Sequence, residues 1–359
     1  MNILSGIFVF IITSYLAFTN ALATQIENLL PSEEDPQTQE EIDEDSDLTL
    51  LPSLFSENIP DILLKNAAYQ QAALSTAGAR GVTASTPTDA LVNIFCTFTT
   101  RDYVRTTTGS GFFVDPDGII MTNAHVAQFL LLEETDQFGD ADCVIRTGSP
   151  AAPEYRAELL YLPPAWVQEN ATNLSETAPL GTGERDYALL YVTESVDETE
   201  LPIIFPALAV NDELLTISIK GADITAAGYP ASELIKNGAA TELLAKEATT
   251  RITELYTFGS NYADVIAIGG TAVGAEGASG GPVLNDNGEV IGIIVTRGDD
   301  ETDGVGSLRA ITMSHVSRTM EQETGQNLPN SLGGNLQLKS ELFTSAVAPL
   351  LLEILERSN

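Results

Sequence analysis

Basic residues are scarce in this sequence of 359 residues. It has 16 lysines and arginines against 51 aspartates and glutamates, which gives a formal net charge of −35 at pH 7. A protein that binds nucleic acid needs clusters of lysine and arginine to contact the phosphates, and this chain lacks them. We therefore expect no nucleic-acid partner, and the excess negative charge favours solubility.

Histidine and cysteine are scarcer still. The two histidines, His125 and His315, and the two cysteines, Cys96 and Cys143, lie in separate segments. Their spacing matches no recognisable set of metal ligands, so we expect neither a metal nor another cofactor. The acidic segment 299–304 (DDETDG) has two interpretations, a solvated loop or a calcium-binding loop.

Charged side chains are absent from residues 1–23, which are mostly apolar and end in the small-residue site Ala21-Leu22-Ala23. This pattern predicts a secretory signal peptide cleaved after Ala23. A signal peptide usually carries a lysine or arginine near its start, and this one has none, so an uncleaved N-terminal anchor is the alternative. Both interpretations predict an exported protein, and only the second gives it a membrane partner.

Lysine and arginine are also absent from residues 24–64, where acidic runs predominate. Such a segment cannot bury enough apolar surface to offset its ordering entropy, so residues 24–88 are interpreted as a largely disordered acidic segment and linker. Within them, the pattern at 61–74 is typical of a helix. A regulatory pro-segment or a metal-binding tract is the alternative role for the acidic residues.

Three short blocks carry the chemistry. Ser279 lies between glycines in segment 277–282 (GASGGP), directly before a β-hairpin pattern, where glycine allows successive N–H groups to point into one space. His125 ends the segment 109–125, which begins GSGFF and ends TNAH. Asp186 precedes the apolar strand pattern of residues 187–192. A serine, a base and a carboxylate are the groups that nucleophilic catalysis by serine requires.

The histidine, the aspartate and the serine follow one another in this order along the chain. Together with the motifs GSGF and TNAH around His125, DYALL at Asp186 and GASGGP at Ser279, this order makes the sequence similar to the trypsin/chymotrypsin-like serine peptidases. The resemblance is closest to the protease domain of HtrA (Deg)-type enzymes and covers residues 90–320. It implies an all-β fold of two six-stranded antiparallel Greek-key barrels with the active site between them. Too few residues remain for the peptide-capture module that HtrA-type enzymes usually carry, so the oligomeric state stays open.

The resemblance divides the chain into a first barrel at 89–204, a second barrel at 205–320 and a helical tail at 321–359. Thirteen runs with strand-like composition, most of them bounded by turn residues, are the predicted strands. In the first barrel they are Leu91–Phe98, Gly111–Asp115, Ile119–Asn123, Cys143–Arg146, Tyr155–Tyr161 and Tyr187–Val192. In the second they are Leu215–Lys220, Asp223–Gly228, Arg251–Tyr256, Val265–Ile268, Pro282–Asn285, Val290–Thr296 and Ser307–Thr312.

The resemblance assigns a catalytic role to one residue in each of the three blocks. Ser279 is the expected nucleophile, His125 the base that takes its proton, and Asp186 the group that orients the imidazole. The backbone N–H groups of Gly277 and Ser279 are expected to form the oxyanion hole. His315 follows the last predicted strand and is interpreted as structural.

Export and the implied barrel give the two cysteines a role as well. The strands that contain Cys96 and Cys143 can be neighbours in a Greek-key barrel, and an exported protein meets oxidising conditions, so we expect a disulfide between them. The alternative is a pair of buried thiols.

The expected specificity pocket follows from the position of the nucleophile. In trypsin-like peptidases the base of this pocket lies about six residues before the serine, which is Val273 here. No buried carboxylate is then available for a substrate lysine or arginine. The walls are expected from Thr296 and Arg309, which favours small or medium aliphatic side chains. An inward Arg309, or Arg297, would instead favour a substrate glutamate or aspartate.

These observations predict an exported serine endopeptidase that needs no cofactor and acts on polypeptides through an acyl-enzyme. The alternative from another class is a binding protein of the same fold in which the triad is silent or held latent. Labelling of Ser279 by a fluorophosphonate distinguishes the two.

Overall fold

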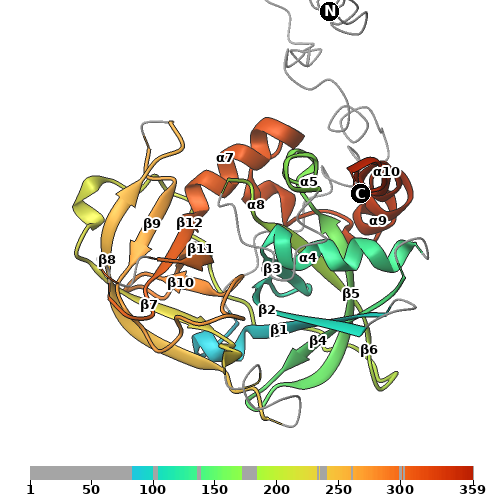
Figure 1. Ribbon diagram of the computed structural model, residues 1–359, viewed down its shortest axis with the longest axis horizontal. Coiled ribbons are helices and arrows are strands. Elements are labelled where there is room, and N and C mark those ends of the chain that lie inside the picture. The colour runs from blue at the N-terminus through green and yellow to red at the C-terminus, as the bar shows by residue number, and fades with distance from the viewer. Residues whose placement is uncertain are drawn as a thin grey trace, which may run out of the picture. The chain divides into compact units, whose positions relative to one another are not determined.

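The computed structural model describes residues 83–99, 104–135, 139–171, 184–232, 234, 241–259, 262–298, 301 and 304–358. Six antiparallel strands of the first half close into a barrel in the order β1-β2-β3-β6-β5-β4 (Figure 1). Their bounds are β1 (Leu91–Thr99), β2 (Val104–Asp115), β3 (Ile119–Thr122), β4 (Asp140–Thr147), β5 (Ala152–Tyr161) and β6 (Ala188–Ser195).

The second half forms a second closed antiparallel barrel, in the order β10-β11-β12-β9-β8-β7. Its strands are β7 (Asp223–Gly228), β8 (Lys246–Tyr256), β9 (Val265–Ile268), β10 (Pro282–Leu284), β11 (Val290–Arg297) and β12 (Leu308–Thr312). The predicted fold class, two six-stranded antiparallel barrels, is therefore confirmed. The expected domain boundaries at 88/89, 204/205 and 320/321 stay predictions.

Local sequence explains the tight connections between strands. Between β2 and β3, the Asp115 carboxylate accepts the N–H of Asp117, and the Asp115 carbonyl accepts the N–H of Gly118. Gly118 has φ +92°, and a Cβ there would lie 2.9 Å from the Phe205 ring. Glycine is therefore required where this turn meets the chain segment that joins the barrels.

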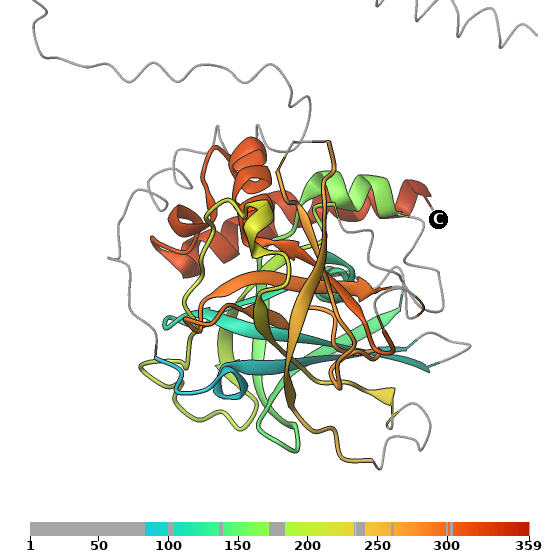
Figure 2. The ribbon, with the colours of Figure 1, turned by 90° about the vertical axis from the view of Figure 1, so that its left-hand side faces the viewer.

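Most of the helices lie on one side of the barrels, at the top in both views (Figures 1 and 2). The α-helices are α4 (Ala124–Leu131), α5 (Pro164–Asn170), α7 (Met313–Thr324), α8 (Leu328–Ser331), α9 (Leu336–Leu342) and α10 (Ala348–Ser358). A π-helical turn, η5 (Phe343–Val347), joins α9 to α10. The short 3-10 turns are η1 (Pro87–Asp89), η2 (Leu132–Glu134) and η4 (Ile217–Ile219).

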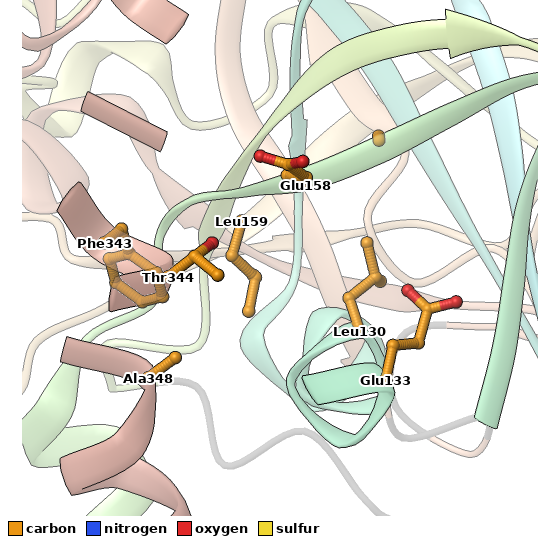
Figure 3. A pocket seen from close by; sticks show the side chains of 8 residues that line it. Leu130, Glu133, Glu158, Leu159, Phe343, Thr344 and Ala348 are labelled. Carbon is orange, nitrogen blue, oxygen red and sulfur yellow. The ribbon is translucent and has the colours of Figure 1, made fainter. Parts of the chain in front are cut away.

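The C-terminal helices return to the first barrel. Phe343, Val347 and Leu351 are buried in the same apolar cluster as the strands of that barrel. The Ser340 hydroxyl donates to the Glu158 carboxylate on β5 at 2.7 Å. A cavity of about 30 Å³ remains between α4, β5 and this segment, near Leu130 (Figure 3). That volume corresponds to about one water molecule, which is too small for a substrate.

One predicted strand is wrong. Leu215–Lys220 alternates between apolar and polar residues, but Ile217–Ile219 forms the 3-10 turn η4, and Ile217 is 73% exposed. The reason is that the second barrel is already closed by six other strands, so no free edge is left for this segment. Helix α4 was not expected either, since only the histidine that it contains was recognised.

The two cysteines form a disulfide within the first barrel. Cys96 and Cys143 are direct cross-strand partners on β1 and β4, and both are buried. Among the described helices, none is long and apolar enough to span a membrane. The expected signal peptide, the acidic segment up to residue 82, and residues 299–300 and 302–303 of the acidic loop lie outside the described residues.

Candidate active site

His125 and Asp186 form a buried pair at the edge of the first barrel. His125 lies in the first turn of α4, and its Nδ1 atom is 2.8 Å from Oδ2 of Asp186. The other carboxylate oxygen accepts the backbone N–H of His125 at 2.9 Å. When the carboxylate accepts this hydrogen bond, Nδ1 is the donor, and in a neutral imidazole Nε2 is then the acceptor.

Asp186 and the residue that follows it are held by hydrogen bonds from two different elements. Its carbonyl oxygen accepts the side-chain N–H of Asn123 at 2.8 Å, and its own side chain has no exposed surface. The hydroxyl of the next residue, Tyr187, lies 2.9 Å from that of Thr319 on α7. Tyr187 is completely buried, and this burial raises the pKa of its hydroxyl. The carboxylate is thus positioned by groups in α7 as well as in its own barrel.

Ser279 lies on a tight turn directly before β10. The flanking Gly277 and Gly280 have φ values of +92° and +89°, a conformation that favours glycine. Ser279 is partly exposed, and its hydroxyl donates to the carbonyl oxygen of Val295 at 3.2 Å. In the described residues it makes no hydrogen bond to His125. A hydrogen bond between Ser279 and His125 requires the Ser279 side chain to move, and such bonds often tighten only with substrate bound.

The turn leaves two backbone donors free. The N–H groups of Ala278, Gly280 and Gly281 donate to carbonyl oxygens at 3.2, 2.8 and 2.9 Å. Within the described part of the chain, the N–H groups of Gly277 and Ser279 donate to no other group. A Cβ on Gly277 would lie 2.6 Å from the carbonyl oxygen of Tyr229, so only glycine fits. Two unpaired donors beside a serine hydroxyl can stabilise a negatively charged oxygen.

The three residues expected around the specificity pocket have different environments. Val273 is fully buried in the apolar core of the second barrel. Thr296 and Arg309 are cross-strand partners on β11 and β12. The Arg309 guanidinium carbon lies 5.1 Å from the centre of the Tyr256 ring. This cation–π contact engages the arginine at the barrel wall, which weakens the interpretation of Arg309 as a partner for acidic substrates.

His315 lies in a separate cluster. Its Nδ1 atom is 3.2 Å from Oδ1 of Asp264, and an Arg318 nitrogen lies 2.6 Å from the same oxygen. Burial lowers the pKa of His315. Across the described segments, no group of three or more histidine, cysteine, aspartate or glutamate side chains is arranged to hold a metal ion.

One comparison with known proteins, that with family models, agrees with the fold. A family model described as trypsin-like peptidase domain matches residues 109–293, which is more than half of the chain. A solved structure of the active form of the Rv3671c protease from M. tuberculosis shares 20% identity with a TM-score of 0.40, over 79% of this chain and 98% of that one. The inactive form of the Rv3671c protease gives 20% identity and a TM-score of 0.37, over 66% and 89%. A search of curated protein sequences found no match.

Proposed function

The chain belongs to the trypsin-like peptidase family, and we propose that it is an exported serine endopeptidase with the catalytic triad His125, Asp186 and Ser279. The observation that carries this proposal is the buried His125–Asp186 pair, in which both carboxylate oxygens are bonded to the same histidine. A structural histidine needs only one partner. The hydrogen bond at Nδ1 fixes the tautomer and the ring orientation, and the backbone N–H holds the carboxylate in place, as general-base catalysis requires.

In the proposed reaction, the Ser279 hydroxyl turns from Val295 toward Nε2 of His125 and attacks the carbonyl carbon of the scissile peptide bond. His125 takes the hydroxyl proton, and Asp186 stabilises the resulting imidazolium. The carbonyl oxygen becomes negatively charged and accepts hydrogen bonds from the N–H groups of Gly277 and Ser279. One such donor is worth on the order of 3 kcal/mol in related sites.

His125 then returns the proton to the leaving amine, and the C–N bond breaks. The acyl group remains on Ser279 as an ester. A water molecule, deprotonated by His125, attacks this ester, and collapse of the second tetrahedral intermediate releases the acid and restores the serine. No cofactor or metal enters these steps.

Export and substrate class are part of the same proposal. The disulfide between Cys96 and Cys143 is compatible with an oxidising compartment, which the apolar sequence of residues 1–23 also favours. We propose polypeptide substrates with a small or medium aliphatic residue before the cleaved bond. The buried, uncharged Val273 supports this preference, since a substrate lysine or arginine would find no counter-charge there.

The hydrogen bond from Ser279 to Val295 favours a second candidate, a protein of the same fold whose site is latent. Treatment of the full chain with a fluorophosphonate, followed by mass spectrometry, decides between them. Labelling of Ser279 that disappears in Ser279→Ala supports the peptidase. If the wild-type protein takes no label and cleaves no peptide in a mixed library, the latent protein is the better description.

A further inference from the structure

Ser110 connects the two barrels at the proposed oxyanion hole. It lies on β2 of the first barrel and is fully buried. Its hydroxyl donates to the carbonyl oxygen of Gly277 at 2.6 Å and accepts the N–H of Tyr229 at 2.8 Å. Its backbone N–H donates to the carbonyl oxygen of Ser279 at 2.7 Å. Two of its three polar groups, the hydroxyl and the N–H, thus bond to the second half of the chain.

The third polar group, the carbonyl, fixes Ser110 itself. Its carbonyl oxygen accepts the hydroxyl of Thr122 on β3 at 2.7 Å, so the residue is held from within its own barrel. The serine turn comes very close at this point, since a Cβ on Gly280 would lie 1.9 Å from the Ser110 carbonyl oxygen. Gly228 also lies beside Ser110, since a Cβ there would be 3.3 Å from the Ser110 hydroxyl oxygen. A small hydroxyl residue fits this space.

Four successive carbonyl groups of the serine turn each have a donor. The carbonyl oxygen of Glu276 accepts the N–H of Ala231 at 2.6 Å, and that of Ala278 accepts the N–H of Gly281 at 2.9 Å. Ser110 supplies the donors for the other two, at positions 277 and 279. The N–H of Gly277 belongs to the peptide plane of the Glu276 carbonyl, and the N–H of Ser279 belongs to that of the Ala278 carbonyl. The Ser110 hydroxyl holds the plane between these two, that of the Gly277 carbonyl, and so limits how the two N–H groups turn relative to each other.

Glycine makes this arrangement depend on its hydrogen bonds. Gly277 has φ +92° and no side chain, so the peptide planes next to it rotate at low steric cost. Loss of the Ser110 hydroxyl removes the partner of the Gly277 carbonyl and of the Tyr229 N–H together. Both groups would then be buried without a partner, which favours rearrangement of the turn.

We propose that Ser110 is a positioning residue of the reaction, whose hydroxyl keeps the N–H groups of Gly277 and Ser279 directed at one point. This inference rests on the proposed peptidase function. Ser110 does not touch the substrate. Its effect belongs to the transition state, where the oxyanion forms, so it acts on kcat rather than on substrate binding.

The test is Ser110→Ala in the full chain, with Ser317→Ala as the matched control. Ser317 is also a buried serine that accepts a backbone N–H, that of Leu328, and donates to an oxygen, that of Asp212, but it has no bond to the serine turn. We expect kcat to fall about 10- to 100-fold in Ser110→Ala, with KM within about threefold of wild type. Affinity for a peptide boronate, which forms a tetrahedral adduct, should fall by a similar factor.

The control separates positioning from general destabilisation. Ser317→Ala should keep kcat within about twofold, and an equal loss of kcat in both variants would overturn the inference. If Ser110→Ala does not fold, Ser110→Cys keeps a weak donor and should show a smaller fall in kcat at unchanged KM. Wild-type kcat and boronate affinity in Ser110→Ala would refute the inference while leaving the peptidase proposal intact. A wild-type protein no more active than Ser279→Ala would refute both.

Discussion

The Nε atom of Arg185 lies 2.7 Å from Oε1 of Glu323, which joins the residue before Asp186 to helix α7. Arg185 has φ +56°, a left-handed conformation that costs a non-glycine residue about 1–2 kcal/mol. Such a conformation persists where the surroundings impose it, and here α7 contacts both neighbours of Asp186 through Glu323 and Thr319. The helix that follows the second barrel thus supports the carboxylate of the first.

The first prediction concerns this ion pair. Glu323→Gln removes the charge but keeps an oxygen that can accept the hydroxyl of Tyr161. We expect the free energy of unfolding to fall by about 1–3 kcal/mol, because Arg185 loses a largely buried partner, and kcat to fall more than KM rises. Urea unfolding and steady-state kinetics measure these quantities. Arg357→Ala, at an exposed pair with Glu353, is the control and should change stability by less than about 0.5 kcal/mol.

The second prediction concerns the triad. Ser279→Ala and His125→Ala should each lower kcat by roughly 10⁶-fold, and Asp186→Asn by roughly 10⁴-fold, with circular dichroism unchanged. Because the three residues act as one unit, the Ser279→Ala/His125→Ala double variant should be hardly worse than either single variant. Near-normal turnover in Asp186→Asn would show that another residue orients His125.

The third prediction concerns the disulfide. The bond between Cys96 and Cys143 spans a sequence separation of 47 residues. In the chain-entropy account, a loop of this length contributes about 4 kcal/mol, so the double variant to alanine should lose stability of that order. Non-reducing peptide mapping of the exported protein checks the bond itself. Two thiols that alkylate without reductant would contradict the expected pairing.

The fourth prediction is a pH dependence of stability that originates at Lys339. This lysine is 1% exposed, and its Nζ atom donates to the carbonyl oxygens of Ser331 and Gly333 at 3.1 and 2.6 Å. Burial lowers its pKa from 10.5 to about 8. Between these values the unfolded chain binds more protons than the folded one, so the free energy of unfolding rises with pH through this window.

Comparison with Lys339→Met tests that sign. From pH 7 to pH 9 the stability of wild type should rise relative to this variant by about 1 kcal/mol. The measurements stay below about pH 9.5 because of Tyr229, whose pKa burial raises to about 12. At higher pH this tyrosine ionises more readily in the unfolded chain than in the folded one, which lowers the free energy of unfolding. Lys220→Met is the control, since Lys220 is exposed and paired with Glu254. A stability difference independent of pH would contradict the lowered pKa.

The fifth prediction concerns specificity. A mixed peptide library should give cleavage mainly after small or medium aliphatic residues, because Val273 supplies no charge at the expected base of the pocket. Arg309→Ala should leave this preference unchanged, since the arginine lies over Tyr256. Dominant cleavage after lysine or arginine would refute the expectation. A preference for glutamate that disappears in Arg309→Ala would favour the acidic alternative.

Strand composition and turn residues located all twelve barrel strands at least in part and added one false strand at 215–220. The blocks around residues 125, 186 and 279 located the candidate site. What the sequence could not provide depends on contacts between distant residues. The role of Ser110 depends on Gly277, 167 positions away, and on closure of both barrels. In the sequence, the only indication of a role for Ser110 was its position in the GSGF block. Likewise, nothing local to Glu323 indicates that it pairs with Arg185.

The return of the C-terminal helices to the first barrel has a consequence for protein synthesis. A chain is made from its N-terminus, and domains generally fold in that order. Here the apolar cluster of the first barrel includes Phe343, Val347, Leu351 and Leu355, which are made after the whole second barrel. While they are missing, the barrel surface near β5 stays uncovered. The first barrel therefore completes its packing only after the second barrel and residues 343–355 have been synthesised.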